Sequence, residues 1–274
     1  SRTPRKVVKH LIDITIFPQY NCKMYHTYID NKYTENQVKK MQFADSKSKT
    51  FHNVISQEQL KSLQNIIKKI KYPEIGKTSK YAGANFRDPL GQKIKEIFHE
   101  PLKKIIGEYD LDFYAWQEAI NPWKIHADIR WYKDKLPYKV ILFPLDVISD
   151  SDSWKDTYTI AFKQRNYLEG NRNTNKGNKG NSNQSDWIRP CEDKGTKNLC
   201  EGYNISKDEH EKYFSHMPYE FLEGLEIDNV FKWTPGSCVT WDQNQLHCAD
   251  NFLTNDIKTK LSLIFFTTQK PEQL

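Results

Sequence analysis

Three side chains that are far apart in the sequence could bind one metal ion. His126 and Asp128 are two residues apart, and on an extended strand this spacing places the imidazole and the carboxylate on one face. The pair is weak evidence by itself, because 8 histidines and 35 acidic residues in 274 predict about one such pair by chance. A third donor, His247, follows a strand-like run and a short polar turn. Two neutral imidazoles and one carboxylate would occupy one face of an octahedral ion and leave three positions for other ligands.

Polar residues downstream extend this pattern. Pro235-Gly236-Ser237 predicts a turn into a strand that ends at Trp241. Lys260 and Ser262 then share one face of an otherwise apolar strand. Such an ordered series is not expected by accident, so it favours metal binding by His126 over a structural role. The remaining histidines lack this context and are interpreted as ordinary surface or core residues: His10, His26, His52, His99, His210 and His216.

Taken in this order, the residues resemble the pattern of the Fe(II)- and 2-oxoglutarate-dependent oxygenases, particularly their prolyl-hydroxylase-like and phytanoyl-CoA-hydroxylase-like branches. The resemblance covers about residues 111–268. It implies that His126, Asp128 and His247 are the catalytic iron ligands. The gap between Asp128 and His247 is long, which requires an insertion in that region.

The same resemblance implies residues that bind 2-oxoglutarate. Lys260 and Ser262 match the pair that holds the distal carboxylate of this cosubstrate. Those branches usually carry Arg in place of Lys260, so here a point charge would replace a bidentate contact. Lys258 is a rival for the same role. Gln117 lies where relatives often place a polar contact to 2-oxoglutarate, although a strand glutamine is commonly just exposed or hydrogen-bonded.

Two residues directly after the motif are candidates for substrate binding. Arg130 continues the side-chain parity of His126 and Asp128, and Trp131 follows it. Both could line the mouth of the site. The alternative is a salt-bridged arginine beside a packed tryptophan.

The activity implied by the resemblance is that of a dioxygenase. It would use O2, with ascorbate as a candidate additional reductant, and would decarboxylate 2-oxoglutarate to succinate. Asp128 stands where halogenating relatives carry a small residue, which favours hydroxylation. A small-molecule substrate is slightly favoured over a peptidyl residue such as proline, because a long insertion suggests an enclosed site. Two alternatives stay open: a non-enzymatic jelly-roll binding module with structural histidines, and a hydrolase that holds zinc in the same triad.

Periodicity predicts the elements that would position these residues. One amphipathic helix begins at Ser56, where Gln59 completes a capping box, and a second begins at Asp88-Pro89 and ends at Gly107. Runs of branched and aromatic residues predict strands at about 7–17, 111–120, 138–145, 237–241 and 260–268.

The predicted fold is mainly β with N-terminal helices, a double-stranded β-helix of the cupin-like jelly-roll type. We expect a single oxygenase domain over residues 1–274, with 1–110 as helical support and 111–268 as the β-helix core. An insertion is expected at about 149–230. It contains the stretch 170–186, whose composition offers too few apolar residues to bury a core. We expect this insertion to act as a lid.

Composition argues against several other classes. A hydrophobic content of 37% supports a core, and apolar runs are far shorter than the roughly 20 residues that span a membrane. The net charge of +6 is carried by 34 Lys and 7 Arg spread along the chain, which gives no clear nucleic-acid signal. The oligomeric state is not indicated. Five cysteines without a Cys-x-x-Cys pair favour reduced thiols and a cytoplasmic location, although Cys191 and Cys200 could form a bridge: Cys22, Cys191, Cys200, Cys238 and Cys248.

Overall fold

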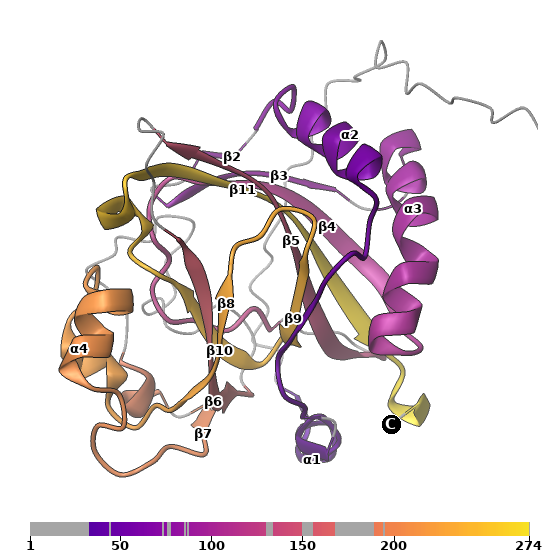
Figure 1. Cartoon of the computed structure of the whole chain (residues 1–274). Helices are drawn as coiled ribbons and strands as arrows, with labels where there is room; N and C mark the ends of the chain where they lie inside the picture. Colours follow the sequence, from indigo (N-terminus) through magenta and orange to yellow (C-terminus); the bar gives the residue numbers. More distant parts are fainter. Residues whose placement is uncertain are drawn as a thin grey trace, which may run out of the picture.

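The chain folds into two antiparallel β-sheets with helices on their outer sides (Figure 1). The computed structural model describes residues 33–43, 45–72, 74–75, 78–84, 86, 88–129, 134–149, 156–167, 189–193 and 195–273. The strand predicted at 7–17 and the polar stretch 170–186 lie outside these residues. Within the described ranges, no helix is both long and apolar enough to cross a membrane.

The larger sheet has the strand order β1-β9-β5-β11-β4-β3-β2. Its strands are β1 (Lys49–Phe51), β2 (Glu74–Ile75), β3 (Ser79–Ala84), β4 (Asp110–Ala119), β5 (Leu136–Ser149), β9 (Cys238–Asp242) and β11 (Ile257–Gln269). In the smaller sheet β10, β6 and β7 are neighbours, and β8 also pairs with β6. These strands are β6 (Tyr158–Asn166), β7 (Thr196–Lys197), β8 (Ile227–Lys232) and β10 (Gln245–Ala249).

The helices are mostly short. The α-helices are α1 (Glu35–Phe43), α2 (Gln57–Ile67), α3 (Pro89–Ile106) and α4 (Lys207–Glu209). One π-helical turn, η3 (His210–Phe214), continues α4. The 3-10 turns are η2 (Pro190–Glu192), η4 (Tyr219–Leu222), η5 (Phe252–Asn255) and η6 (Pro271–Gln273).

A shared apolar core lies between the two sheets. It combines side chains from the larger sheet with side chains from the smaller one, among them Ala115, Leu142, Trp241, Ile264, Ala161 and Phe231. Strands that are neighbours in space, such as β9, β5, β11 and β4, are far apart in sequence. Two facing antiparallel sheets with these long crossovers form a jelly roll. The predicted double-stranded β-helix is therefore confirmed.

Helices α2 and α3 cover the outer face of the larger sheet (Figure 1). Both begin as predicted: Ser56 caps α2 in a capping box with Gln59, and the Asp88 carboxylate accepts from the backbone N–H of Gly91 at the start of α3. Gly107, with a φ of 79°, ends α3. The apolar stripes of the two helices pack on the sheet and so fix the wall that carries β4 and β11.

The predicted insertion at about 149–230 needs correction, because much of it belongs to the core. β6 and the start of β8 fall within these limits, and both are strands of the smaller sheet. The part between β7 and β8 packs on the outer face of that sheet, where Phe214 and Leu222 join a cluster with Phe162 of β6. The lid function expected of this segment stays a prediction, and residues 168–188 lie outside the described ranges.

Candidate metal centre

A backbone bridge brings His126 beside His247. The N–H of His126 donates to the carbonyl oxygen of His247 at 2.9 Å, and the N–H of His247 donates to that of His126 at 2.8 Å. Asp128 is held alongside, since its N–H donates to the Gln243 carbonyl oxygen at 3.0 Å. His247 also pairs with Ala161, whose side chain lies in the core between the sheets. Because directly opposite residues share a face, both imidazoles belong to the inner side of the smaller sheet.

Each imidazole is oriented by a backbone carbonyl. Nδ1 of His126 lies 2.7 Å from the carbonyl oxygen of Lys124, and Nδ1 of His247 lies 3.0 Å from that of Gln245. In a neutral imidazole, an Nδ1–H that donates to a carbonyl leaves the Nε2 lone pair for a ligand bond. This is the usual support for metal-binding histidines.

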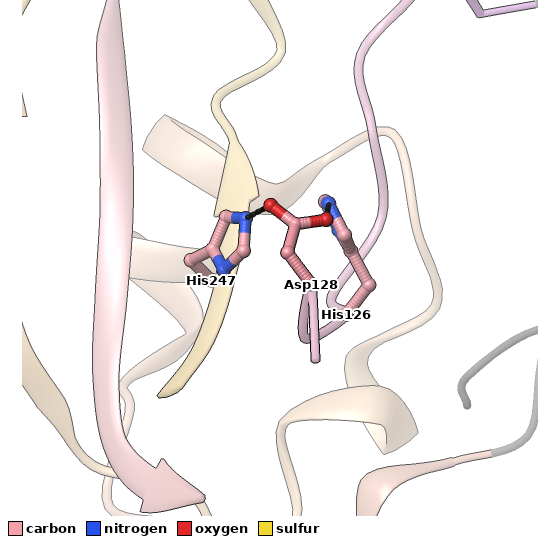
Figure 2. A group of neighbouring side chains, drawn as sticks. All are labelled: His126, Asp128 and His247. Atoms are coloured by element: carbon pink, nitrogen blue, oxygen red, sulfur yellow. Dashed lines mark ion pairs between the residues drawn. The ribbon is translucent and has the colours of Figure 1, made fainter. Parts of the chain in front are cut away.

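The Asp128 carboxylate lies between the two Nε2 atoms (Figure 2). Its Oδ2 is 3.3 Å from Nε2 of His247, and its Oδ1 is 3.7 Å from Nε2 of His126. All three donors lie within 4.8 Å of one another. Ligands at right angles and about 2.1 Å from an ion are about 3 Å apart. The three residues predicted from the sequence thus fit one face of an octahedral ion.

Burial prepares the histidines for metal binding. The side chain of His126 is 9% exposed and that of His247 is 6% exposed, whereas that of Asp128 is 23% exposed. Burial lowers the pKa of His126 to about 4, and His247 contributes to this lowering. A neutral imidazole can bind a metal without first losing a proton. The greater exposure of Asp128 makes the carboxylate side the open side of the centre.

Two tryptophans flank the imidazoles. The Trp123 ring centroid is 5.1 Å from that of His126, and the Trp241 centroid is 4.7 Å from that of His247. Trp241 belongs to the core between the sheets, as predicted. These rings limit the rotation of the ligand side chains.

A set of polar residues lies on the inner face of the larger sheet. Ser262 on β11 pairs directly with Gln117 on β4. The Ser262 hydroxyl donates to the Gln117 side-chain oxygen at 3.3 Å, and the Gln117 amide donates to the Tyr81 hydroxyl at 2.6 Å. The structure therefore brings together two of the residues predicted to bind 2-oxoglutarate, in an otherwise apolar core.

Lys260, two residues before Ser262, is the buried cation of this strand. Its side chain is 1% exposed. Its Nζ donates to the Tyr158 carbonyl oxygen at 2.8 Å, lies 3.4 Å from an oxygen of Asp250, and sits 4.1 Å from the centroid of the Trp233 ring. Burial lowers the pKa of Lys260 to about 8, and Asp250 opposes this shift.

Three predicted site residues remain: Lys258, Arg130 and Trp131. Lys258 is exposed, and the register of β11 against β5 shifts between Ile257 and Thr259. Arg130 and Trp131, the predicted substrate contacts, lie outside the described residues. Their role therefore stays a prediction.

Sequence reasoning missed Asp250 and Trp233. Asp250 stands three residues after His247, but a lone acid in a turn carries no motif. Trp233 reaches Lys260 only because β8 pairs with β6, a pairing that the sequence does not reveal. The signal that could have found Asp250 is the buried Lys260 itself, since a buried ammonium requires a carboxylate or carbonyl partner.

The described cysteines and histidines outside the centre form no further metal site. Cys191 and Cys200 are free thiols, so the bridge considered between them is absent. Cys248 points into the cluster behind the smaller sheet, as expected for packing. Within the described part of the chain, His126, Asp128 and His247 form the one group of three or more His, Cys, Asp or Glu side chains that could hold an ion.

Comparison with known proteins gives similarity at the level of the fold. No protein-family model matches the chain, and no curated protein matches it. An oxidoreductase of the 2OG-Fe(II) oxygenase family from Burkholderia pseudomallei aligns over 88% of this chain and 93% of its own, with 8% identity and a TM-score of 0.45. HygX from Streptomyces hygroscopicus, solved with nickel, 2-oxoglutarate and hygromycin B, aligns over 86% and 88%, with 11% identity and a TM-score of 0.45.

A viral collagen prolyl hydroxylase from Paramecium bursaria Chlorella virus-1, solved with 2-oxoglutarate, aligns over 82% of this chain and 96% of its own. Its identity is 7% and its TM-score is 0.40. Because these TM-scores are below 0.5, the metal and 2-oxoglutarate sites are argued from the side chains of this protein.

Proposed function

We propose that this protein is an Fe(II)- and 2-oxoglutarate-dependent dioxygenase that hydroxylates its substrate and releases succinate. One observation carries the proposal: a ring nitrogen of His126, a ring nitrogen of His247 and a carboxylate oxygen of Asp128 all lie within 4.8 Å of one another. Two imidazoles and one carboxylate on one face, with the other positions open, form the facial triad of non-heme Fe(II) oxygenases. Iron bound there would supply the activation of O2, with 2-oxoglutarate as the source of two electrons.

The residues of this chain would bind and orient the cosubstrate. Lys260 is the candidate anchor for the distal carboxylate, because it is buried between the sheets whereas Lys258 is exposed. Ser262 and Gln117, which are hydrogen-bonded to each other on the same face, would complete the contact. A charge-assisted hydrogen bond of this kind contributes about 1.5–3 kcal/mol.

We propose hydroxylation as the reaction and a small molecule as the substrate. The Asp128 carboxylate fills a ligand position that a halide would otherwise take, which favours hydroxylation over halogenation. A long connection joins β6 and β8, and a long insertion of this kind favours an enclosed site. We therefore prefer a small molecule over a peptidyl residue as the substrate. We further propose that the helices α2 and α3 and the two sheets act as a single oxygenase domain, located in the cytoplasm, with Arg130 and Trp131 at the substrate mouth. Ascorbate is a candidate additional reductant.

The test is a titration of the anaerobic protein with Fe(II) and 2-oxoglutarate. The oxygenase should develop a weak visible charge-transfer band, which should be absent with Asp128→Ala. On admission of O2, succinate should form and should increase when the true substrate is present in a screen of metabolites and peptides. A binding module with structural histidines would give neither signal, and a zinc hydrolase would release no succinate under any condition.

A further inference from the structure

The buried pair of Lys260 and Asp250 lies beside the metal centre without being part of it. Each side chain is 1% exposed, and the nearest nitrogen–oxygen distance is 3.4 Å. An ammonium has three N–H donors. Three groups surround Nζ: the Tyr158 carbonyl, the Asp250 carboxylate and the face of the Trp233 ring. The contact to Asp250 is the longer of the two hydrogen bonds, so it is the one most easily exchanged for another carboxylate.

Asp250 is held in place independently of Lys260. The Thr157 hydroxyl donates to its Oδ1 at 2.7 Å, and the Asn255 side-chain amide approaches its Oδ2 at 3.4 Å. Its backbone N–H donates to the Tyr158 carbonyl oxygen at 3.3 Å. The carboxylate therefore keeps its position if the ammonium turns toward a ligand.

Asp250 is also the charge that balances Lys260. Two other titratable groups influence Lys260 within the described part of the chain, Cys248 and His216. Burial raises the pKa of the Cys248 thiol well above its ordinary value and lowers the pKa of His216 to about 4, so both are neutral near pH 7. Burial lowers the pKa of Lys260, and the Asp250 carboxylate opposes this lowering.

We propose that Asp250 is a positioning residue that keeps Lys260 protonated and oriented between the sheets before 2-oxoglutarate arrives. This inference rests on the proposed function, since it assumes that Lys260 receives the distal carboxylate. The incoming carboxylate then takes over the N–H directed at Asp250, while the bond to the Tyr158 carbonyl is kept. The contacts described for the Asp250 carboxylate are to Thr157, Asn255 and Lys260, so its effect on turnover is expected to pass through Lys260.

The test measures proton uptake when 2-oxoglutarate binds to the Ni(II)-loaded protein, by titration calorimetry in buffers of different ionisation enthalpy. The wild-type protein should take up little proton near pH 7, because Lys260 is already charged. In Asp250→Asn, Lys260 loses its counter-charge and its pKa should fall further below about 8, so proton uptake near pH 7 should rise clearly above the wild-type value, toward one proton per ligand. The affinity of this variant for 2-oxoglutarate should fall about tenfold per pH unit above the lowered pKa of Lys260. At low pH the affinity should equal or exceed that of the wild type, because the ammonium is then charged and the competing Asp250 carboxylate is absent.

The matched control is Asp156→Asn, which removes the same charge from an exposed carboxylate that is paired with Lys232 at 2.7 Å. It should retain the wild-type proton uptake and pH profile. Ni(II) affinity should be equal in all three proteins. Wild-type proton uptake in Asp250→Asn would overturn the inference.

A second variant covers the case in which Asp250→Asn does not fold. Thr157→Val keeps the Asp250 charge but removes the hydroxyl that orients it, so the pH profile should shift in the same direction by a smaller amount, and an unshifted profile would count against the inference. Failure of the Ni(II)-loaded wild-type protein to bind 2-oxoglutarate at all would instead reject the proposed function. Binding by the wild type with no difference in the variants rejects the role of Asp250 alone.

Discussion

At the scale of single residues, the two histidines and Asp128 contribute differently to the centre. The second ring nitrogen of each histidine is held by a carbonyl, so both imidazoles are fixed whether or not an ion is present. The Asp128 side chain is 23% exposed and completes the donor set from the open side. Its removal should therefore affect the ion far more than the fold.

Asp128→Ala should abolish Fe(II) binding while changing the free energy of unfolding by less than about 1 kcal/mol, as is usual for partly exposed positions. Metal titration and chemical denaturation of the metal-free protein measure the two effects separately. Asp110→Ala, which removes an exposed carboxylate paired with Lys135 at 2.7 Å, should leave metal binding intact. Succinate production by Asp128→Ala at the wild-type rate would contradict the ligand assignment.

Lys260→Met should raise the 2-oxoglutarate concentration needed for half-saturation by about 10- to 100-fold, because a charge-assisted contact of about 1.5–3 kcal/mol is lost. The single substitution also leaves Asp250 buried without its cation, a loss that is destabilising. The double variant Lys260→Met with Asp250→Asn removes that charge and should fold while still binding 2-oxoglutarate poorly. If Lys258→Met gives the large effect instead, the anchor has been assigned to the wrong lysine.

At the scale of elements, the helices on the larger sheet depend on local signals. Ser56 accepts from the N–H of Gln59 at 3.1 Å, and the Gln59 side chain accepts from the N–H of Ser56 at 2.8 Å. The apolar stripe of α2 then packs against the sheet, and Gln64 donates to the Leu145 carbonyl oxygen at 2.6 Å. A helix of this length is held by its cap and its packing together.

Ser56→Ala should reduce the free energy of unfolding by about 1 kcal/mol, because the first turn of α2 loses its side-chain acceptor. Ser62→Ala is the matched control within the same helix, where alanine is the better helix former. Denaturant unfolding of the two variants gives the comparison. Equal stability of the two would show that packing alone holds the helix, and metal affinity should be unchanged in both.

The elements also explain how much the sequence could predict. Helices α2 and α3 and strands β4, β5 and β11 carry their signals in local period and caps, so these predictions are confirmed with small changes in bounds. The His126 and Asp128 pair could be found because its spacing is local. In contrast, β6 and the start of β8 lay inside a segment interpreted as an insertion, because their place in the sheet depends on pairing with each other across a long connection. Asp250 was missed for the same reason, because its partner Lys260 is brought near by the sheet.

At the scale of the whole molecule, a buried network of charges joins the segment before β1 to both sheets. Asp242 on β9 pairs with Lys139 on β5 and lies 3.1 Å from the Arg165 guanidinium on β6. The N–H of Ser46 donates to the same carboxylate at 2.8 Å, and Asp45 lies 3.5 Å from Arg165. Removal of one member of such a buried network leaves an uncompensated charge. The network therefore makes residues 45–48 part of the folded barrel.

The acid stability of the whole protein follows from two histidines with lowered pKa values. Burial lowers the pKa of His126 and of His216 from 6.5 to about 4. As the pH falls, the unfolded chain takes up these protons near pH 6.5, whereas the folded chain does so only near pH 4. The unfolded state holds more protons in this window, so stability falls as the pH falls through it.

The metal-free protein should therefore lose up to about 3 kcal/mol of stability for each of these histidines between about pH 6.5 and pH 4, at 1.36 kcal/mol per pKa unit. Denaturant unfolding across this range measures the loss. His216→Leu should reduce the pH-dependent loss of unfolding free energy by the contribution of one histidine. His216 is suited to this test because it is not one of the proposed metal ligands and both of its ring nitrogens are buried. The exposed His52, replaced in the same way, is the control for loss of a surface imidazole. A curve for His216→Leu as steep as that of the wild type would mean that His216 is protonated in the folded protein as readily as in the unfolded chain.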